Sequence, residues 1–338
     1  MAQNDVLFAK MKGTIKVLVG SKAVEDKIFS TGFYILSPKE NISKDFLYFF
    51  FLTDSFNKQK DSLCTGATMS GLNNAGLKRI KILLPIDKNG NPDLAEQNRM
   101  VAILAEAEKL KKKCAEADEK MDVLIPSFFI EMFGNPEINH KKWEVETLRN
   151  VSEKISDGPF GSNLKTEHYT SSGVRVIRLK NIGVGTIIDN DRAYVSEEHA
   201  DFLKKHICVS GDVIAGTLGD PNLRAIILPA EIPRAINKAD CVQIRPKSNV
   251  VTAEFLCWLL NSPHTLSMAS GMISGQTRSR ISMGRLAELR VPVPPFDLQK
   301  EFSRLVKVIE SQKEKQKRSA EKINDIFQSL LSGVFTGK

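Results

Sequence analysis

The sequence repeats itself across a long interval, and this duplication constrains the fold more than any other feature. At one constant offset, Asp45-Phe46-Leu47 corresponds to Glu254-Phe255-Leu256, and Pro85, which closes an alternating apolar run, corresponds to Pro294. The positions that match in between are Gly66 with Gly275, Thr68 with Thr277, Leu72 with Ile281, Leu77 with Leu286, Ile80 with Leu289, Ile82 with Val291 and Leu84 with Val293. Turn residues, strand alternation and a terminal proline recur together, which indicates two copies of one structural unit.

The match extends beyond this block in both directions. Upstream, Asn4-Asp5-Val6-Leu7 resembles Gly211-Asp212-Val213-Ile214 at a slightly different offset. Downstream, Pro92-Asp93-Leu94 aligns with Phe296-Asp297-Leu298, and the first copy carries an additional turn at residues 87–91. Both copies are therefore expected to contain a strand near Asp5 or Asp212 and to continue into the segment that follows.

A long helix is predicted after each copy. Apolar residues in both segments follow alternating steps of three and four residues, which is the seam of a coiled coil. Each helix is expected to run for roughly 30 residues, or ~45 Å at 1.5 Å per residue, and Pro126 is expected to end or kink the first. We predict that the two helices pair with each other; the alternative is that each packs as an amphipathic helix on its own domain. The predicted interface consists of Met100, Ile103, Ala107, Leu110, Ala117, Leu124, Leu305, Ile309, Gln312, Gln316 and Ile323.

The segment between the helices has a different character. Short β-rich runs such as Val174–Leu179 and Ala225–Leu228 alternate with turn clusters such as Leu218–Asn222, which is typical of a mixed globular domain. The predicted class is α+β, with globular domains alternating with two long helices that pair as an antiparallel coiled coil. The expected boundaries are 1–92 for a partial first domain, 93–134 for the first helical segment, 135–295 for a complete second domain and 296–338 for the second helical segment.

Composition excludes several classes of protein. With 338 residues the chain is long enough for two or three domains. No apolar run approaches the ~18 residues that a membrane span requires, and the N-terminus lacks the layout of a signal peptide, so we expect a cytoplasmic protein with no membrane contact. Lysine and arginine exceed aspartate and glutamate by 48 to 40, giving a net charge of +8, which is compatible with a polyanionic partner without requiring one.

No catalytic or metal site is predicted. The five cysteines are scattered, and the five histidines show no metal-ligand spacing. Gly183-Val184-Gly185 lacks the third glycine of a dinucleotide loop, and the ending Gly333–Lys338 runs out before the hydroxyl residue of a phosphate-binding loop. Pro92-Asp93 stands where a helix start favours proline and a carboxylate, so its structural interpretation is preferred over a nuclease motif. A free-standing enzyme is therefore the weakest hypothesis.

Five motifs, in a particular order and partly duplicated, point to one family. They are the helix entry Pro92–Gln97 with Arg99-Met100-Val101, the helix exit Phe129–Gly134, the domain opening Gly158–Ser162, the strand Gly211–Ile214, and Pro292–Pro295 leading into Asp297-Leu298-Gln299. Over essentially the whole chain the arrangement resembles the specificity (S) subunit of type I restriction-modification systems. In that family two target recognition domains alternate with two helical spacers.

The resemblance implies a noncatalytic subunit that reads a bipartite double-stranded DNA target. It implies as partners the methyltransferase (M) subunits, which dock on the helices, and the restriction and translocation (R) subunit. No cofactor is expected on this chain, whereas S-adenosylmethionine, ATP and Mg²⁺ are implied for the partner subunits. Comparison with the family implies that the first recognition domain is truncated at its start, which leaves open completion by another chain or self-association. The alternative is a truncated scaffold that binds methyltransferase through its helices without reading a complete DNA site.

Candidate DNA contacts are polar and basic residues on loops of the second domain, since these residue types read base edges and grip phosphates. For each of them an ordinary surface role is the competing interpretation. The Gln276–Arg280 loop holds two arginines, whereas its counterpart at residues 67–71 carries no charge, as expected if two domains read different sequences. The predicted DNA-binding residues are Ser162, Asn163, Lys165, Arg178, Lys180, Asn181, Arg224, Gln276, Arg278 and Arg280.

Overall fold

The chain folds into two compact units. The computed structural model describes residues 1–24, 27–66, 70–275 and 279–336. Unit 1 comprises Met1–Glu119 and Glu314–Lys338, and unit 2 comprises Lys120–Lys313. Helices α4 (Leu94–Asp122) and α10 (Phe296–Thr336) contribute residues to both units. The α+β class is confirmed, and the two long helices begin close to the expected segment starts, although the four domain boundaries themselves stay a prediction.

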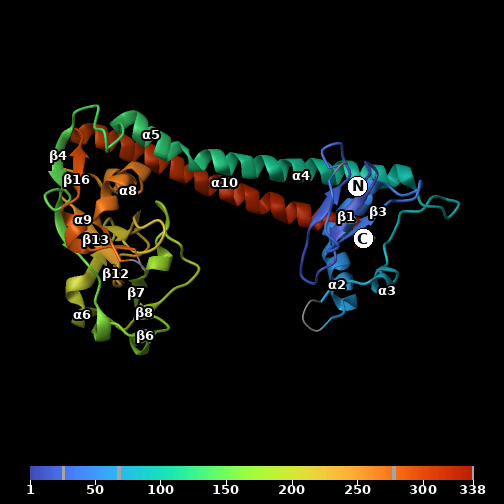
Figure 1. Ribbon diagram of the computed structural model, residues 1–338, viewed down its shortest axis with the longest axis horizontal. Helices are drawn as coiled ribbons and strands as arrows, with labels where there is room; N and C mark the ends of the chain where they lie inside the picture. The colour runs from blue at the N-terminus through green and yellow to red at the C-terminus, as the bar shows by residue number, and fades with distance from the viewer. Residues whose placement is uncertain (25–26, 67–69, 276–278, 337–338) are drawn as a thin grey trace. The chain divides into compact units, whose positions relative to one another are not determined.

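Unit 1 places helices on one face of a small antiparallel sheet (Figure 1). The strand order is β2 (Val17–Val19), β1 (Val6–Ala9), β3 (Phe33–Leu36). Val6 and Phe8 of the central strand pack on the phenylalanines of α1 (Lys44–Leu52) and on Phe56 of α2 (Asp54–Leu63). The short α3 (Asn74–Leu77) follows. Because burying one phenylalanine contributes ~1.5–3 kcal/mol, this aromatic cluster is the main source of stability in unit 1.

Unit 2 contains two stacked sheets with helices on the outside of one of them. The first sheet has the order β11-β10-β13-β5, and the second has the order β6-β8-β7-β12-β9. The strands of unit 2, including those of two further two-stranded sheets (β14-β15 and β16-β4), are β4 (Glu144–Thr147), β5 (Ser152–Ser156), β6 (Tyr169–Thr170), β7 (Val174–Ile177), β8 (Tyr194–Val195), β9 (Ile207–Val209), β10 (Val213–Gly216), β11 (Arg224–Ile227), β12 (Arg234–Asn237), β13 (Cys241–Pro246), β14 (Ile273–Ser274), β15 (Arg280–Ile281) and β16 (Arg290–Val293). Its helices are α5 (Leu124–Phe133), α6 (Glu197–Phe202), α7 (Ala253–Leu260), α8 (Pro263–Ala269) and α9 (Met283–Ala287).

The first sheet of unit 2 is covered on both faces. Val213 and Ala215 of β10 pack with α7 in one hydrophobic cluster. Ile214, which points to the opposite face, packs with Ile177 and Ala235 of the second sheet in another. Side chains alternate across a strand, so the continuous apolar run of β10 follows from burial on both sides.

The duplication seen in the sequence is a duplication of structure. Helices α1 and α7 begin at equivalent hydroxyl residues, where the Ser43 and Thr252 side chains accept hydrogen bonds from the Phe46 and Phe255 amides. A hydroxyl at this position satisfies one of the free N–H groups of the first turn. The two phenylalanines are buried in equivalent helices, which confirms the match between the copies.

The entries into the long helices match in a register different from the predicted one. Gln97 and Gln299 are both fully buried. The Gln97 side chain accepts a hydrogen bond from the amide of Ser43, the cap of α1, at 3.0 Å, and Gln299 accepts one from the amide of Thr252, the cap of α7, at 2.9 Å. Equating the two glutamines sets Leu94 against Phe296, the first residues of α4 and α10. The alignment of Pro92-Asp93-Leu94 with Phe296-Asp297-Leu298 is therefore wrong by two residues, because a buried amide network fixes the register.

The first long helix is interrupted ahead of Pro126. Helix α4 ends at Asp122 and α5 begins at Leu124, with Val123 between them. Proline lacks an N–H, and its ring clashes with the carbonyl four residues earlier, which here belongs to Asp122. The predicted kink is confirmed, and it lies one turn before the proline itself.

The two long helices are antiparallel in each unit. In unit 1, Leu104 shares a cluster with Phe327, while further along α4 the Cys114 carbonyl accepts a hydrogen bond from Gln316 at 3.4 Å. In unit 2, Asp122 pairs with Lys313 at 2.8 Å, and Phe133 contacts Phe302 with ring centroids 5.2 Å apart. Higher numbers on the first helix meet lower numbers on the second, which confirms the predicted direction of pairing.

The helix contacts favour some of the predicted interface residues over others. Ala107 and Ile309 are buried, and Met100, Ala117, Leu305, Gln316 and Ile323 are partly buried. In contrast, Ile103, Leu110 and Leu124 are exposed by 43%, 51% and 37%, and Gln312 is exposed. The neighbours Leu104, Val306 and Phe327 are buried instead. A straight helix drifts ~20° per heptad from a strict 3.5-residue repeat, so the buried stripe moves to adjacent positions along these long helices.

Candidate nucleic-acid interface

A tight loop after β5 is held against the end of β12 by a glycine. A Cβ on Gly158 would lie 2.1 Å from the carbonyl carbon of Lys238, so no other residue fits without moving the backbone. The Asp157 side chain reinforces this approach, because its Oδ1 accepts the amides of Gly158 at 2.8 Å and Asp240 at 3.1 Å. The Gly158–Ser162 motif therefore serves first to bring two loops together.

Arg280, the first residue of β15, contacts both of these loops. Its guanidinium lies 3.2 Å from Asp157 Oδ2 and 2.7 Å from Asp240 Oδ1, and it sits over the ring of Phe160 at 5.4 Å. Burial raises the pKa of Asp157, against the lowering effect of the Gly158 amide and of Arg280. Since Arg280 is 36% exposed, it can both anchor the loops and face a ligand.

A second cluster centres on Tyr169. Lys238 donates to the Tyr169 hydroxyl at 3.0 Å, and the guanidinium of Arg178 lies 5.9 Å from the centre of the tyrosine ring. Arg178 also pairs with Asp191 at 2.7 Å, and Lys180 forms an ion pair with the same carboxylate. The Arg178 side chain is only 18% exposed, whereas that of Lys180 is 53% exposed, so Lys180 is the residue that presents charge to solvent.

Three predicted contacts lie together on the exposed turn after the glycine loop. Ser162 and Asn163 belong to a 3-10 turn at Gly161–Asn163, and Lys165 follows it. All three are exposed. The Asn163 carbonyl oxygen lies 3.0 Å from His199 Nε2, which ties the turn to α6.

Two predicted contacts are occupied inside the protein. Asn181 is fully buried and donates to the Ile188 and Asp191 carbonyls. Arg224 donates to four backbone carbonyls, those of Leu179, Ile182, Leu218 and Pro221, at 2.7–3.3 Å. Both residues hold loops together, because buried polar groups need partners. Gln276 and Arg278 lie outside the described residues.

Sequence reasoning missed Phe160, Tyr169 and Lys238. Phe160 is 51% exposed beside Arg280. Lys238 reaches the cluster because β12 pairs in parallel with β7, setting Asn237 opposite Ile177, so that the residues following both strands converge. A basic residue after each strand was visible in the sequence, but the pairing of two strands so far apart was not.

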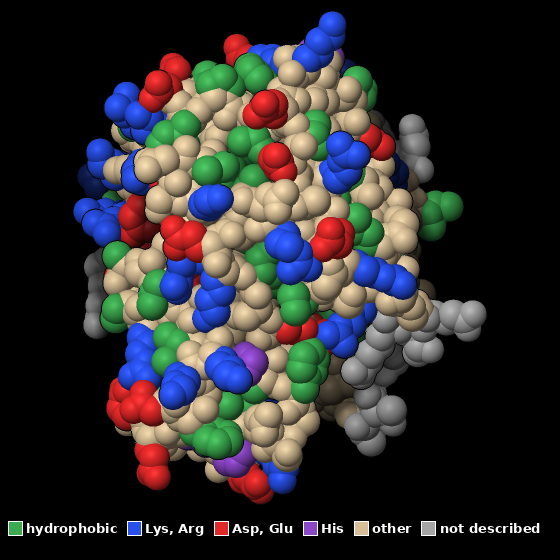
Figure 2. All heavy atoms as spheres, turned by 90° about the vertical axis from the view of Figure 1, so that its left-hand side faces the viewer, with side chains coloured by type: hydrophobic (Ala, Val, Ile, Leu, Met, Phe, Trp, Pro, Cys, Tyr) green, Lys and Arg blue, Asp and Glu red, His purple; other side chains and the backbone are tan. Residues whose placement is uncertain are grey.

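The face of unit 2 turned toward the viewer in Figure 2 carries charges of both signs. Lysine and arginine side chains are interspersed with aspartate and glutamate, and no continuous basic surface stands out. On this face the positive charge is therefore distributed, and any ligand of it meets individual basic residues rather than one large positive field.

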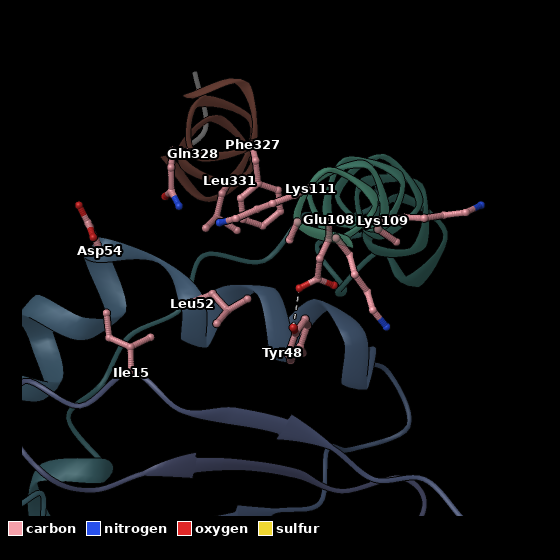
Figure 3. Close-up of a pocket in the computed structure, with 13 residues that line it drawn as sticks. Ile15, Tyr48, Leu52, Asp54, Glu108, Lys109, Lys111, Phe327, Gln328 and Leu331 are labelled. Carbon is pink, nitrogen blue, oxygen red and sulfur yellow. Dashed lines mark hydrogen bonds between the residues drawn. The ribbon is translucent and has the colours of Figure 1, made fainter. Parts of the chain in front are cut away.

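Unit 1 carries a groove between α1, α4 and α10 (Figure 3). Its volume is about 860 Å³, and its lining combines apolar Leu52, Phe327 and Leu331 with Lys109 and Lys111. Figure 3 shows the Tyr48 hydroxyl turned toward Glu108, to which it donates at 2.6 Å. Burial raises the pKa of Tyr48, and the neighbouring Glu108 carboxylate adds to the effect. The tyrosine stays neutral, and the groove offers a mixed apolar and basic surface.

The described part of the chain offers little to catalysis. Within it no group of three or more histidine, cysteine or carboxylate side chains is placed to hold a metal ion. Burial raises the pKa of the Cys208 thiol to about 12 and that of Cys257 further, so neither supplies a reactive thiolate at neutral pH. None of the helices that the structure describes is long and apolar enough to cross a membrane.

Known proteins resemble this chain in sequence and in fold. The profile of the "Type I restriction modification DNA specificity domain" matches residues 1–117. The type I restriction enzyme MjaVIII specificity subunit of Methanocaldococcus jannaschii is 22% identical over 96% of this chain and 76% of its own length. The MjaIX specificity subunit of the same organism is 26% identical over 53% of this chain and 44% of its own length.

Solved structures share the fold. A chain from a study of complex assembly and conformational transition of the type I R-M system aligns with a TM-score of 0.64 and 17% identity, covering 100% of this chain and 83% of that one. The type I restriction-modification S subunit from M. genitalium aligns with a TM-score of 0.55 and 18% identity, covering 99% and 83%. Sequence similarity over 96% of this chain, the family profile at residues 1–117 and the shared fold together support a specificity subunit of type I restriction-modification systems.

Proposed function

We propose that unit 2 reads one part of a bipartite double-stranded DNA target. The observation that carries the proposal is the convergence of two loops with the start of β15, joined by Asp157, Asp240 and Arg280. It lies beside an exposed turn with Ser162, Asn163 and Lys165. Side chains of these types read base edges when a rigid support holds them in register. The interlocked loops supply that support.

The residues divide into two roles. Asn163 and Ser162 have short polar side chains that suit base contacts, and Lys180 and Lys165 are exposed cations that suit phosphates. All four basic side chains pair with carboxylates, but those of Arg178 and Arg280 are less exposed, by 18% and 36% against 52% and 53% for Lys165 and Lys180. We infer that these two arginines position the loops, and that Arg280 can also face the DNA across Phe160.

The chemistry belongs to other subunits in this proposal. The helices α4 and α10 dock methyltransferase subunits, and the apolar and basic groove at Tyr48, Lys109 and Leu331 is the surface in unit 1 that suits a protein partner. The restriction and translocation subunit joins that assembly. S-adenosylmethionine, ATP and Mg²⁺ bind the partner subunits, and this chain holds none of them.

The test is co-expression with the cognate methyltransferase, followed by mapping of methylated sites in the host genome. A bipartite motif supports reading by two domains. A palindrome of identical halves instead supports two chains pairing through unit 2. Normal assembly without any modification overturns the proposal and favours the scaffold alternative, which binds methyltransferase but reads no DNA.

Two substitutions separate the roles within unit 2. Asn163→Ala is expected to relax one position of the methylated motif, a discrimination of ~1–3 kcal/mol. Lys180→Ala is expected to weaken binding to all sequences alike and to reduce the slope of log affinity against log salt by ~0.9. The matched control is Lys204→Ala, at an exposed lysine elsewhere in unit 2. It should change neither the methylated motif nor the salt dependence of binding.

A further inference from the structure

The two units offer equivalent strands with different neighbours. Val6 lies opposite Leu36 as Val213 lies opposite Ile244, so β1 and β3 of unit 1 correspond to β10 and β13 of unit 2. In unit 2, β13 pairs with β10 on one side and with β5 on the other. In unit 1, β3 pairs with β1 alone among the described residues. The outer edge of β3 is therefore open where its counterpart is paired.

A second open edge lies at residues 80–85. The constant offset of the repeat makes this segment the counterpart of β16, which in unit 2 pairs with β4. Residues 80–85 form no strand. The backbone groups of Ile82 and Leu84 make no hydrogen bond to any residue that the structure describes. Lys81, which precedes Ile82, is engaged on its other side, where the Gln59 side chain bonds both its N–H and its C=O.

The free backbone groups are those that a partner strand would use. In unit 2, Leu148 donates to the Leu289 carbonyl at 2.9 Å, and alternate residues of an antiparallel strand turn their backbone to the same neighbour. Leu289, Val291 and Val293 therefore face β4. Their counterparts in unit 1 are Ile80, Ile82 and Leu84. The Ile80 N–H donates to the Leu77 carbonyl at 3.2 Å, as the Leu289 N–H donates to Leu286 at 3.1 Å, so at Ile80 the carbonyl is the group left for a partner strand.

One short segment supplies the strands that fill both edges in unit 2. Strands β4 and β5 follow each other directly, within Glu144–Ser156. Strand β4 carries two glutamates, whereas residues 78–81 of unit 1 read Lys-Arg-Ile-Lys. At the open edge of β3, Ile35 is 44% exposed, while its counterpart Gln243, which lies opposite Ser156 of β5, is fully buried. The two edges, the charge and the exposed Ile35 fit the same kind of occupant.

We propose that unit 1 is a strand-acceptor site for an acidic segment that supplies two strands, of the type formed by Glu144–Ser156. The first donated strand pairs antiparallel with residues 80–84, and the second pairs antiparallel with β3. Main-chain hydrogen bonds supply the affinity in such strand addition, and side chains of alternate residues supply the selectivity. The site is independent of DNA reading by unit 2.

The experiment uses the full chain and a synthetic peptide with the sequence of Glu144–Ser156. Binding is measured by fluorescence anisotropy, and hydrogen exchange with mass spectrometry locates it. The expected result is saturable binding with new protection of the amides of residues 33–36 and 80–84. Protection confined to unit 2, or no binding at all, overturns the proposal. So does concentration-dependent dimerisation of the chain alone that Ile82→Pro abolishes, because the occupant would then be a second copy.

Two proline substitutions supply a matched pair. Ile82→Pro removes an N–H that faces the donated strand, and one lost hydrogen bond of ~1 kcal/mol weakens binding about fivefold or more. Leu83→Pro places proline where β16 itself has Pro292, at a position whose backbone faces away from β4, and should bind normally. Equal loss in both variants overturns the proposal. Should Ile82→Pro fail to fold, Arg79→Glu takes its place: it is expected to weaken binding by charge repulsion, with the exposed Lys58→Glu as control, and unchanged binding again overturns the proposal.

Discussion

Units 1 and 2 contain the same motif of a small sheet packed on a capped helix, and they differ in what lies on the far face of the sheet. In unit 2 the residues on that face, Ile214 and Ile226, are buried against a second sheet. In unit 1 their counterparts include Leu18, which is half exposed. The repeat therefore encodes the contact between sheet and helix, and separate segments of the chain provide the second layer.

The largest expected difference between the units concerns Ile226 and Leu18, which occupy equivalent positions on the far face. Ile226→Ala should destabilise unit 2 by ~2–5 kcal/mol, because it leaves a cavity between two sheets. Leu18→Ala should destabilise unit 1 by about 1 kcal/mol or less, since much of the side chain already contacts water. Both tryptophans lie in unit 2, so fluorescence during denaturation reports unit 2 and hydrogen exchange reports unit 1. Equal losses would contradict the comparison.

Gln97 and Gln299 test whether equivalent buried residues stabilise the two units equally. Each buried amide bridges a long helix to the cap of the short helix in its own unit. Replacing either with alanine leaves buried backbone groups without partners, which costs ~1–3 kcal/mol. We expect similar losses in the two units, measured by hydrogen exchange at α1 and α7. A loss in one unit alone would show that the networks are not equivalent.

Asp157 makes unit 2 sensitive to pH. Burial raises its pKa above that of the unfolded chain, so the folded state binds the proton more tightly. Its contribution to stability is present below the ordinary pKa of aspartate and is lost as pH rises through the raised value. Asp157→Asn should reduce the loss of unit 2 stability that accompanies rising pH in that acid range. The measurement is tryptophan fluorescence in denaturant at several pH values. A steeper fall in the variant would show the opposite sign.

The smallest effect is expected for the exposed ion pair beside the β4–β5 segment. Arg149 and Glu288 lie 2.9 Å apart, with side chains 57% and 60% exposed. Exposed pairs of this kind contribute ~0–1 kcal/mol, so Arg149→Ala should barely change the denaturation midpoint of unit 2. A loss well above that range would mean that charge, rather than strand pairing, holds the segment in place.

Local patterns predicted the elements that depend on neighbours in the sequence. The capped helices with Phe46 and Phe255 and the strands at Val6 and Val213 follow from spacing and from repeat matching. The interruption near Pro126 follows from the chemistry of proline. The sequence predicted the candidate site only in part. Lys165 and Lys180 are exposed, as a DNA contact requires, whereas Asn181 and Arg224 bond to other residues of the protein. Nothing local distinguishes an arginine that faces solvent from one whose donors all meet carbonyl oxygens.

The sequence by itself determined the duplication, the α+β class, the two long helices and the likeness to specificity subunits, because these depend on periodicity and on short motifs that recur along the chain. Only the tertiary structure decided the register set by Gln97 and Gln299, the convergence of Lys238 and Tyr169, and the open edges of unit 1. Each of these depends on which distant segments pair, and pairing is settled by the burial and hydrogen bonding of whole layers.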